Sequence, residues 1–180
     1  MKILVAGNPT YGVAAEIYKI YPEAEFRSRT TNYDLGTTHG HEKFANESVD
    51  FDVIILCSAL HKFNQTILLH NVYNKLVEKN LRSRIICLGS TVDKTNTGKI
   101  WLYSAEKKAL NDYCNTLNIH GVWNKGPRVT LFSFGSLSNV QHKHPGRKCI
   151  DINKIALYVK WIIEQPEELC INELSIDPLQ

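Results

Sequence analysis

Short apolar runs alternate along the chain with longer segments whose apolar residues recur at helical spacing. The run FDVIILCSA is almost continuously apolar, as in strands that are buried on both faces of a parallel sheet. In the segment after Gly12, apolar side chains recur three to four residues apart, which predicts a helix. Strands are predicted at Lys2–Ala6, Ala24–Arg27, Phe51–Ala59, Arg84–Leu88, Arg128–Gly135 and Ile171–Asp177, and helices at Val13–Tyr21, Asn64–Glu78, Tyr103 to about Leu117 and Asn153–Glu164.

This alternation of strands and helices predicts an α/β fold. Strand–helix–strand units place successive strands parallel and joined by right-handed crossovers. We therefore expect a Rossmann-like, doubly wound parallel sheet of six or seven strands flanked by helices. The 180 residues, of which 43% are hydrophobic, are enough for one well-buried domain over residues 1–180. Residues 30–50 are polar and rich in turn formers, and no element is assigned to them.

The charge and cysteine content exclude several classes of protein. The net charge of +3 comes from 21 basic and 18 acidic residues spread through the sequence, so nucleic-acid binding is not indicated. Five scattered cysteines are typical of reduced thiols rather than of disulfides. The first residues lack the apolar length of a signal peptide, and no apolar run is long enough to cross a membrane. We expect a cytoplasmic protein that binds neither nucleic acid nor membranes.

Three residues are candidates for a carbonyl-reducing site. Tyr103 and Lys107 are four positions apart in a predicted helix and so share a face, and Ser90 follows a predicted strand thirteen positions before Tyr103. A phenol titrates at about 10, and a neighbouring ammonium is expected to lower its pKa toward a value suited to proton transfer. Ser90 would then hydrogen-bond the substrate oxygen. Taken singly, these residues are also typical of a solvated helix edge or of a turn.

A dinucleotide site is predicted where the first strand meets the first helix. In doubly wound sheets, a pyrophosphate lies against the N-terminus of that helix. Gly7 permits the tight turn, Gly12 lets the backbone approach a phosphate, and Ala14 is small enough for helix and strand to pack closely. A plain strand-to-helix loop is the alternative. The other cofactor candidates in this turn are Asn8, Tyr11 and Val13.

The residues after the second strand bear on the choice of nucleotide. Arg27 and Arg29 lie near the place where the adenosine ribose is expected, and an arginine there suits a 2′-phosphate. NADP is therefore the expected cofactor, with NAD as the alternative, and Asp34 is a candidate partner for the adenine ring. Ordinary surface arginines are the competing interpretation.

Together these motifs resemble the short-chain dehydrogenase/reductase family over nearly the whole chain. The specific markers are YSAEK at 103–107 and the spacing from Ser90 to Tyr103. Weaker markers are the glycine turn, YDL at 33–35, FDVIILCSA at 51–59, GST at 89–91, RVTLFSFGSLSN at 128–139 and the closing INELSIDP.

The resemblance implies NAD(P)-dependent oxidoreduction. In the family's scheme Tyr103 exchanges a proton with the substrate, Ser90 positions the substrate oxygen, and Lys107 binds the nicotinamide ribose and lowers the pKa of Tyr103. Asn64, twenty-six positions before Ser90, matches the asparagine that holds a water in the proton relay, whereas Asn71 would need a much shorter helix. By position the resemblance also places Cys57, Ser58, Ala59, Phe134 and Gly135 at the cofactor.

Some positions depart from the family pattern. Ala6 replaces a threonine, Ala14 replaces the third glycine, and the first turn is one residue longer and includes Tyr11. The chain is also shorter than common members, which predicts a reduced substrate cap and an open site. In the family, two adjacent helices pair with a second copy. A homodimer or homotetramer is therefore expected, with apolar side chains of Leu69, Tyr73, Trp101, Tyr103 and Tyr113 available for the contact.

The expected function is that of an NADP(H)-dependent oxidoreductase that interconverts a small carbonyl compound and its alcohol. The alternative is a dinucleotide-binding protein with little or no catalysis, acting as a sensor or assembly partner. No metal is expected, because the histidine pairs His39/His41 and His142/His144 lack further ligands. Lys143, Arg147 or Lys148 is expected to steer an anionic substrate.

Overall fold

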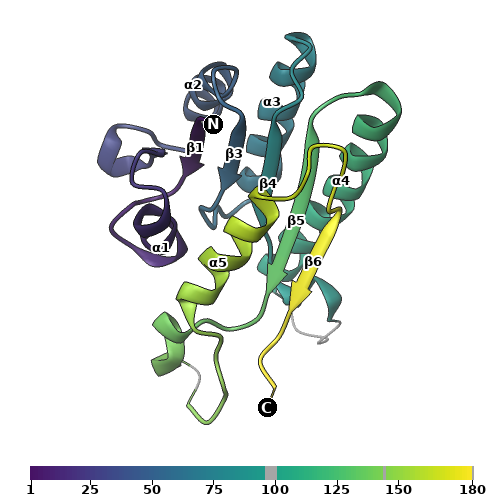
Figure 1. Ribbon diagram of the computed structural model, residues 1–180. Helices are drawn as coiled ribbons and strands as arrows, with labels where there is room; N and C mark the ends of the chain where they lie inside the picture. Colours follow the sequence, from purple (N-terminus) through teal and green to yellow (C-terminus); the bar gives the residue numbers. More distant parts are fainter. Residues whose placement is uncertain (96–100, 144, 180) are drawn as a thin grey trace.

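A computed structural model describes residues 1–95, 101–143 and 145–179 and contains one parallel sheet. Its six strands are hydrogen-bonded in the order β2-β1-β3-β4-β5-β6 (Figure 1). All five strand pairings are parallel, which confirms the predicted fold class. The strands are β1 (Ile3–Ala6), β2 (Glu25–Arg27), β3 (Val53–Leu56), β4 (Arg84–Leu88), β5 (Arg128–Phe134) and β6 (Glu173–Ile176).

In the described part of the chain, five α-helices cover the two faces of the sheet (Figure 1). On one face α1 and α5 pack on strand residues such as Ile55 and Phe132, and on the other α2, α3 and α4 pack on residues such as Ile54 and Leu131. Neighbouring strand residues therefore point into opposite cores, as the continuous apolar runs require. The helices are α1 (Gly12–Ile20), α2 (Thr38–Ser48), α3 (Asn64–Glu78), α4 (Leu102–Asn124) and α5 (Ile152–Ile163).

The strand order reverses at β1. From β1 the chain first adds β2 on one side and then crosses to add β3, β4, β5 and β6 on the other side. At such a switch point the two connections leave the sheet in opposite directions, so a crevice opens beyond the carboxyl ends of β1 and β3. This topology, rather than any single residue, decides where a ligand can bind.

Most predicted elements agree with the structure to within two or three residues. The helix at Asn64–Glu78 and the strand at Arg84–Leu88 have the predicted bounds. The helix that carries Tyr103 continues to Asn124 instead of ending near Leu117. It continues because Asn118 is held by tertiary bonds, with its side-chain oxygen accepting the N–H of Val129 at 3.2 Å.

One helix lies in the region to which no element was assigned. The side chain of Thr37 caps α2 by accepting the N–H of Gly40 at 3.1 Å. Along α2, Phe44 and Ala45 are buried against the α3 side of the core. The sequence does not predict this helix, because only one narrow face of it is apolar. That face is buried only through its packing against α3.

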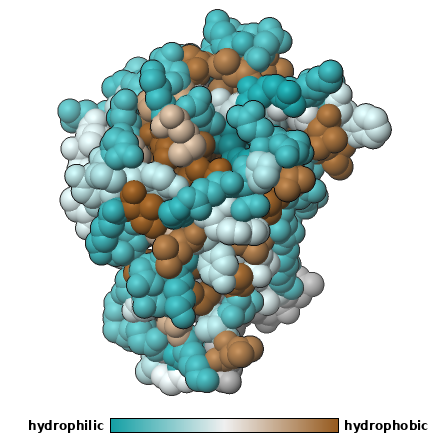
Figure 2. Space-filling view, in the orientation of Figure 1, coloured by the Kyte–Doolittle hydropathy of each residue, from teal (hydrophilic) through white to brown (hydrophobic). Residues whose placement is uncertain are grey.

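The apolar side chains expected at a subunit contact are distributed differently. Leu69 and Tyr73 are 0% and 2% exposed and belong to the core, so the expectation that they lie on a free surface is wrong. Exposed apolar residues occur instead on other parts of the helices, and on the face shown in Figure 2 they form several separate groups. Within the described residues, none of the helices combines the length and the apolar character needed to span a bilayer.

Candidate active site

A cleft with a volume of about 860 Å³ opens at the carboxyl ends of β1, β3, β4 and β5. Its size falls in the range of about 300–1,000 Å³ that is typical of small-molecule sites. Residues that end or follow the strands line it, among them Gly7, Cys57, Gly89 and Phe134. The cleft is therefore the crevice that the strand order creates.

The turn between β1 and α1 forms one wall of this cleft. A Cβ atom on Gly7 would lie 2.8 Å from the Cβ of Ala14, so only glycine lets α1 pack this closely on the strand. Gly12 has a φ of +64° and open space where a side chain would stand. The N-terminus of α1, whose first N–H groups have no partner within the helix, can therefore be approached by a ligand oxygen. This turn fits the pyrophosphate of a dinucleotide.

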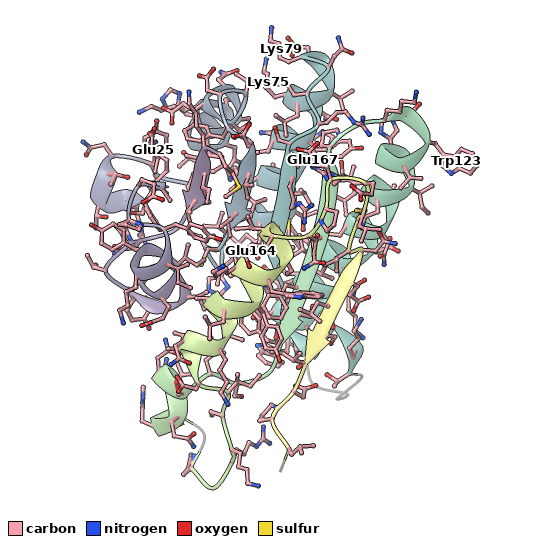
Figure 3. The ribbon with its side chains drawn as sticks, in the orientation of Figure 1. Glu25, Lys75, Lys79, Trp123, Glu164 and Glu167 are labelled. Carbon is pink, nitrogen blue, oxygen red and sulfur yellow. The ribbon has the colours of Figure 1, made fainter. Side chains whose placement is uncertain are left out.

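Arg27 was predicted to contact the cofactor, but it does not line the cleft. Its guanidinium is paired with two carboxylates, donating from Nε to Glu47 at 2.7 Å and from Nη2 to Glu25. Arg27 and both carboxylates line a separate surface hollow, and Glu25 is labelled on β2 in Figure 3. The assignment of Arg27 to the cofactor is therefore wrong, and the reason is a tertiary contact with α2. The cleft is lined here by Ser28, Arg29, Thr30 and Asp34.

Ser90 and Tyr103 come together as their spacing predicted. The Ser90 side chain is close enough to the Tyr103 phenol to affect its pKa, and Ser90 Oγ accepts the N–H of Val92 at 3.4 Å. Burial raises the pKa of Tyr103, the Ser90 side chain opposes this, and the carboxylates of Glu106 and Asp93 raise the pKa further. The net direction is upward, and Lys107 is not among the groups that shift the pKa of Tyr103, contrary to the expectation that it lowers this pKa.

Lys107 is buried beside the tyrosine, with 5% of its surface exposed. Its ammonium lies 5.5 Å from the centre of the Tyr103 ring and donates to the side-chain oxygen of Gln65 at 2.6 Å and to the carbonyl of Leu88 at 3.5 Å. Burial is the main reason that the pKa of Lys107 falls to about 8, against the opposing effect of nearby groups that include Glu106. Lys107 lines the cleft, but its charge is directed to the strand ends more than to the phenol.

Gln65 is a residue that the sequence analysis missed. Its amide nitrogen donates to the carbonyl of Leu88 at 2.9 Å while its oxygen receives the ammonium of Lys107, so it joins β4 to α4. Asn64, the residue that the resemblance predicts for the proton relay, lines the cleft but donates from its side chain to the carbonyl of His61 at 2.8 Å. Gln65 lies three positions before Leu68 and is buried on the same face of α3. A polar residue on this otherwise apolar face was the sign in the sequence that Gln65 has a buried polar partner.

Two carboxylates stand behind the Ser90–Tyr103 pair. Asp93 Oδ2 accepts hydrogen bonds from Asn111 at 2.8 Å and from Ser133 at 3.1 Å, which ties the segment after β4 to α4 and β5. Glu106 is 6% exposed and accepts the backbone N–H of Lys62. Neither acid was identified from the sequence, although Glu106 stands out as an acid between Tyr103 and Lys107.

Most of the remaining candidates line the cleft. Ser90 and Gly135 do not, and a side chain on Gly135 would meet Asp177, so that glycine faces the C-terminal segment. The thiol of Cys57 has its pKa raised to about 12 by burial, so it stays protonated at neutral pH. The predicted residues that the structure brings to the cleft are Gly7, Asn8, Tyr11, Gly12, Val13, Arg29, Asp34, Cys57, Ser58, Ala59, Asn64, Tyr103, Lys107 and Phe134.

Of the histidines in the two predicted pairs, His39, His41 and His142 are described, and none of these three lines the cleft. His41 is buried in α2 and its Nε2 is 2.7 Å from the carbonyl of Leu35. His144 lies outside the described residues. Among the residues that are described, no group of three or more histidine, cysteine or acidic side chains could hold a metal ion.

Comparisons with known proteins identify the fold. No protein-family model matches the sequence, and no curated protein matches it. A serine dehydrogenase from Escherichia coli superposes with a TM-score of 0.71 at 16% identity over 98% of this chain and 97% of that one. A short-chain dehydrogenase from Burkholderia cenocepacia in complex with NADP gives 0.75 at 12% identity over 97% and 87%.

A third neighbour has the same architecture. It is a Pseudomonas 3-alpha-hydroxysteroid dehydrogenase complexed with NADH, with a TM-score of 0.75 at 13% identity over 98% of this chain and 95% of that one. At these identities the likeness concerns the fold and not the chemistry. The strand order, the cleft and these neighbours together show that the chain has the fold of the short-chain dehydrogenases and reductases.

Proposed function

We propose that the protein is an NADP(H)-dependent oxidoreductase that interconverts a small carbonyl compound and its alcohol. One observation carries this proposal above the others. The phenol of Tyr103 lines the cleft, the Ser90 side chain is close enough to lower the pKa of that phenol, and the buried ammonium of Lys107 lies one helical turn further along α4. Two adjacent hydroxyls can hold one carbonyl oxygen and deliver a proton to it.

The residues of the cleft divide the work between binding and proton transfer. The bound nicotinamide would supply or accept the hydride. The turn from Gly7 to Val13 would hold the pyrophosphate and Lys107 the nicotinamide ribose. Ser90 would orient the substrate oxygen while the phenol of Tyr103 donates its proton to that oxygen in reduction. Because the pKa of Tyr103 is raised, the phenol holds its proton across the neutral range and is in the form that donates during carbonyl reduction, although the same shift makes it a weaker acid.

We assign the preference for NADP to the segment after β2. Arg29 lines the cleft, and the hydroxyls of Ser28 and Thr30 lie 2.7 Å from each other beside it. A guanidinium and two hydroxyls suit a phosphate on the adenosine ribose. Asp34, also at the cleft, suits a free ribose hydroxyl and is the residue that would favour NAD.

We also propose that the protein acts as a homodimer or homotetramer in the cytoplasm. Ile119, Val122 and Trp123 are 62%, 65% and 81% exposed near the end of α4, where Figure 3 shows Trp123 directed away from the molecule. Large exposed apolar residues in one place suggest a protein contact. All five cysteines are free, which suits a reducing compartment. Light scattering of the wild type and of Trp123→Ala tests the assembly.

The alternative function is dinucleotide binding without turnover. It is favoured by the position of the Lys107 ammonium, which Gln65 and the carbonyl of Leu88 draw toward the strand ends. A protein of this kind would bind NADPH and leave it unchanged. The two functions therefore differ in a directly measurable way.

The experiment measures binding and turnover separately. Tryptophan fluorescence titrated with NADPH and NADH gives the affinities, and loss of nicotinamide absorbance with a set of carbonyl compounds gives the turnover. Tyr103→Phe should reduce kcat at least about 100-fold, since general acid catalysis contributes roughly 10² to 10⁴, while NADPH affinity is retained. Tyr113→Phe is the matched control, because its hydroxyl contacts His70 at 2.6 Å and does not line the cleft. Normal turnover by Tyr103→Phe contradicts the mechanism, and tight binding without any turnover by the wild type favours the alternative.

A further inference from the structure

The connection between β3 and α3 has an unusual backbone next to Tyr103. Lys62 and Phe63 follow each other with φ values of +58° and +60°, in the left-handed region that side chains disfavour. Such backbone persists only where surrounding contacts hold it, and it is concentrated at functional sites. The conformation of this turn must therefore be held by contacts with the rest of the cleft wall.

Glu106 is the contact that holds this turn. Its buried carboxylate accepts the N–H of Lys62 through Oε1, and its Oε2 lies 3.9 Å from Nδ1 of His61. Glu106 belongs to α4, so its contacts fix the turn to the helix that carries Tyr103, the proposed proton donor. The ring of His61 accordingly lies 6.4 Å from the ring of Tyr103, centre to centre.

The side chains of the turn give this end of the cleft a basic wall. His61 and Lys62 both line the cleft, and the imidazole is 76% exposed. Among the described residues that line the cleft, Asp34 is the one acid, and it belongs to the segment after β2. Glu106 does not line the cleft, and its two oxygens face the turn. A neutral substrate would need neither cationic nor donor groups here.

We propose that His61 and Lys62 form a subsite for an anionic group, a carboxylate or a phosphate, on the substrate whose carbonyl Tyr103 protonates. This assignment of the substrate class rests on the proposed function. The ammonium supplies charge and the imidazole supplies a directed N–H, which together suit an oxygen anion. The substrate is thus an oxo acid or an oxo phosphate.

The subsite differs from the basic segment that the sequence suggested. Lys143, Arg147 and Lys148 belong to the connection between β5 and α5, of which Leu137 and Asn139 line the cleft and the three basic residues do not. The wall beside Tyr103 is thus supplied by the β3–α3 turn. Whether the more distant segment steers substrates stays a separate prediction.

The test compares pairs of substrates that share a carbonyl group and differ in whether they carry an anionic group. Laevulinate and methyl laevulinate form one pair, and dihydroxyacetone phosphate and dihydroxyacetone form another, each assayed with NADPH. The wild type should have a kcat/KM at least 10-fold higher for the anion of one pair, and the pair that shows it identifies a carboxylate or a phosphate. Lys62→Gln and His61→Asn should reduce that preference by 10-fold or more, mainly through KM. Lys79→Gln is the matched control, because Figure 3 places Lys79 beyond the far end of α3.

A binding measurement keeps this inference distinct from the proposed function. Calorimetric titration of the NADP-loaded protein with the same four compounds needs no turnover. Tighter binding of an anion than of its neutral partner, lost in Lys62→Gln, supports the subsite even if no carbonyl is reduced. Equal binding of both members of each pair, or an unchanged preference in Lys62→Gln and His61→Asn, overturns it. Turnover of the neutral compounds alone would support the proposed oxidoreductase function and contradict the anion subsite.

Discussion

The ammonium of Lys107 donates a hydrogen bond to the side-chain oxygen of Gln65, 2.6 Å away. Gln65 is itself fixed, since its amide nitrogen donates to the carbonyl of Leu88 at the end of β4. A buried cation thus has a defined neutral acceptor at the base of the cleft. The contact explains how Lys107 stays inside the protein, and it draws the charge toward the strand ends instead of the Tyr103 hydroxyl.

The titration of Lys107 should make stability depend on pH. Its pKa is about 8 in the folded protein against 10.5 ordinarily. Between these values the unfolded chain binds more protons, so the free energy of unfolding should rise with pH over this window. The gain is at most about 3 kcal/mol. Urea unfolding at intervals from pH 7 to pH 10 in the wild type and in Lys107→Met measures it, and equal pH dependence in both proteins would contradict the assignment.

Two substitutions should move the pKa of Tyr103 in opposite directions. Ser90→Ala removes the side-chain hydroxyl that lowers this pKa, so the basic limb of the pH–rate profile should shift to higher pH. Glu106→Gln removes a charge that raises it, so that limb should shift to lower pH, while the amide can still accept the N–H of Lys62. The profiles of kcat/KM against pH measure both shifts. Glu164→Gln, at the end of α5 (Figure 3), is the charge-matched control, and shifts of the same sign would refute the prediction.

The two arginines after β2 should have separable roles. Arg29→Ala should lower the affinity for NADPH roughly 10-fold or more relative to NADH, as expected for loss of a charge-assisted phosphate contact of about 1.5–3 kcal/mol. Arg27→Ala should leave that ratio unchanged, because its guanidinium is committed to Glu25 and Glu47. Fluorescence titration with both nucleotides measures the ratio. A loss of NADPH preference in Arg27→Ala alone would reverse the assignment.

Burial of α2 should contribute strongly to stability. Phe44 is 0% exposed and joins α2 to the core shared with α3. Phe44→Ala should lower the free energy of unfolding by about 3–5 kcal/mol, through lost apolar burial and the cavity that remains. Phe63→Ala removes a phenylalanine that is 37% exposed and should cost clearly less. Denaturant titration compares the two variants, and equal losses would mean that α2 is not anchored through Phe44.

The elements that the sequence predicted are those whose pattern is strong over a short stretch. Short apolar runs such as residues 85–88 are typical of strands buried in a parallel sheet, and the strand predicted at Arg84–Leu88 has these bounds in the structure. α2 was not predicted because it has few apolar residues, and these are buried only through their packing against α3. The end of α4 was missed for the same reason, since Asn118 is held by the N–H of Val129 from β5.

For the candidate site, the sequence by itself determined which residues come close through local spacing and strand ends. The turn from Gly7 to Val13 and the Ser90–Tyr103 pair belong to this class. The tertiary structure alone decided where charges point, because electrostatic partners come from segments distant in the sequence. In the folded protein Arg27 donates a hydrogen bond to Glu47 and Lys107 donates one to Gln65, and these contacts span 20 and 42 positions of the sequence. Periodicity determines which face a side chain occupies, but the partner it meets there depends on how the helices pack over the sheet.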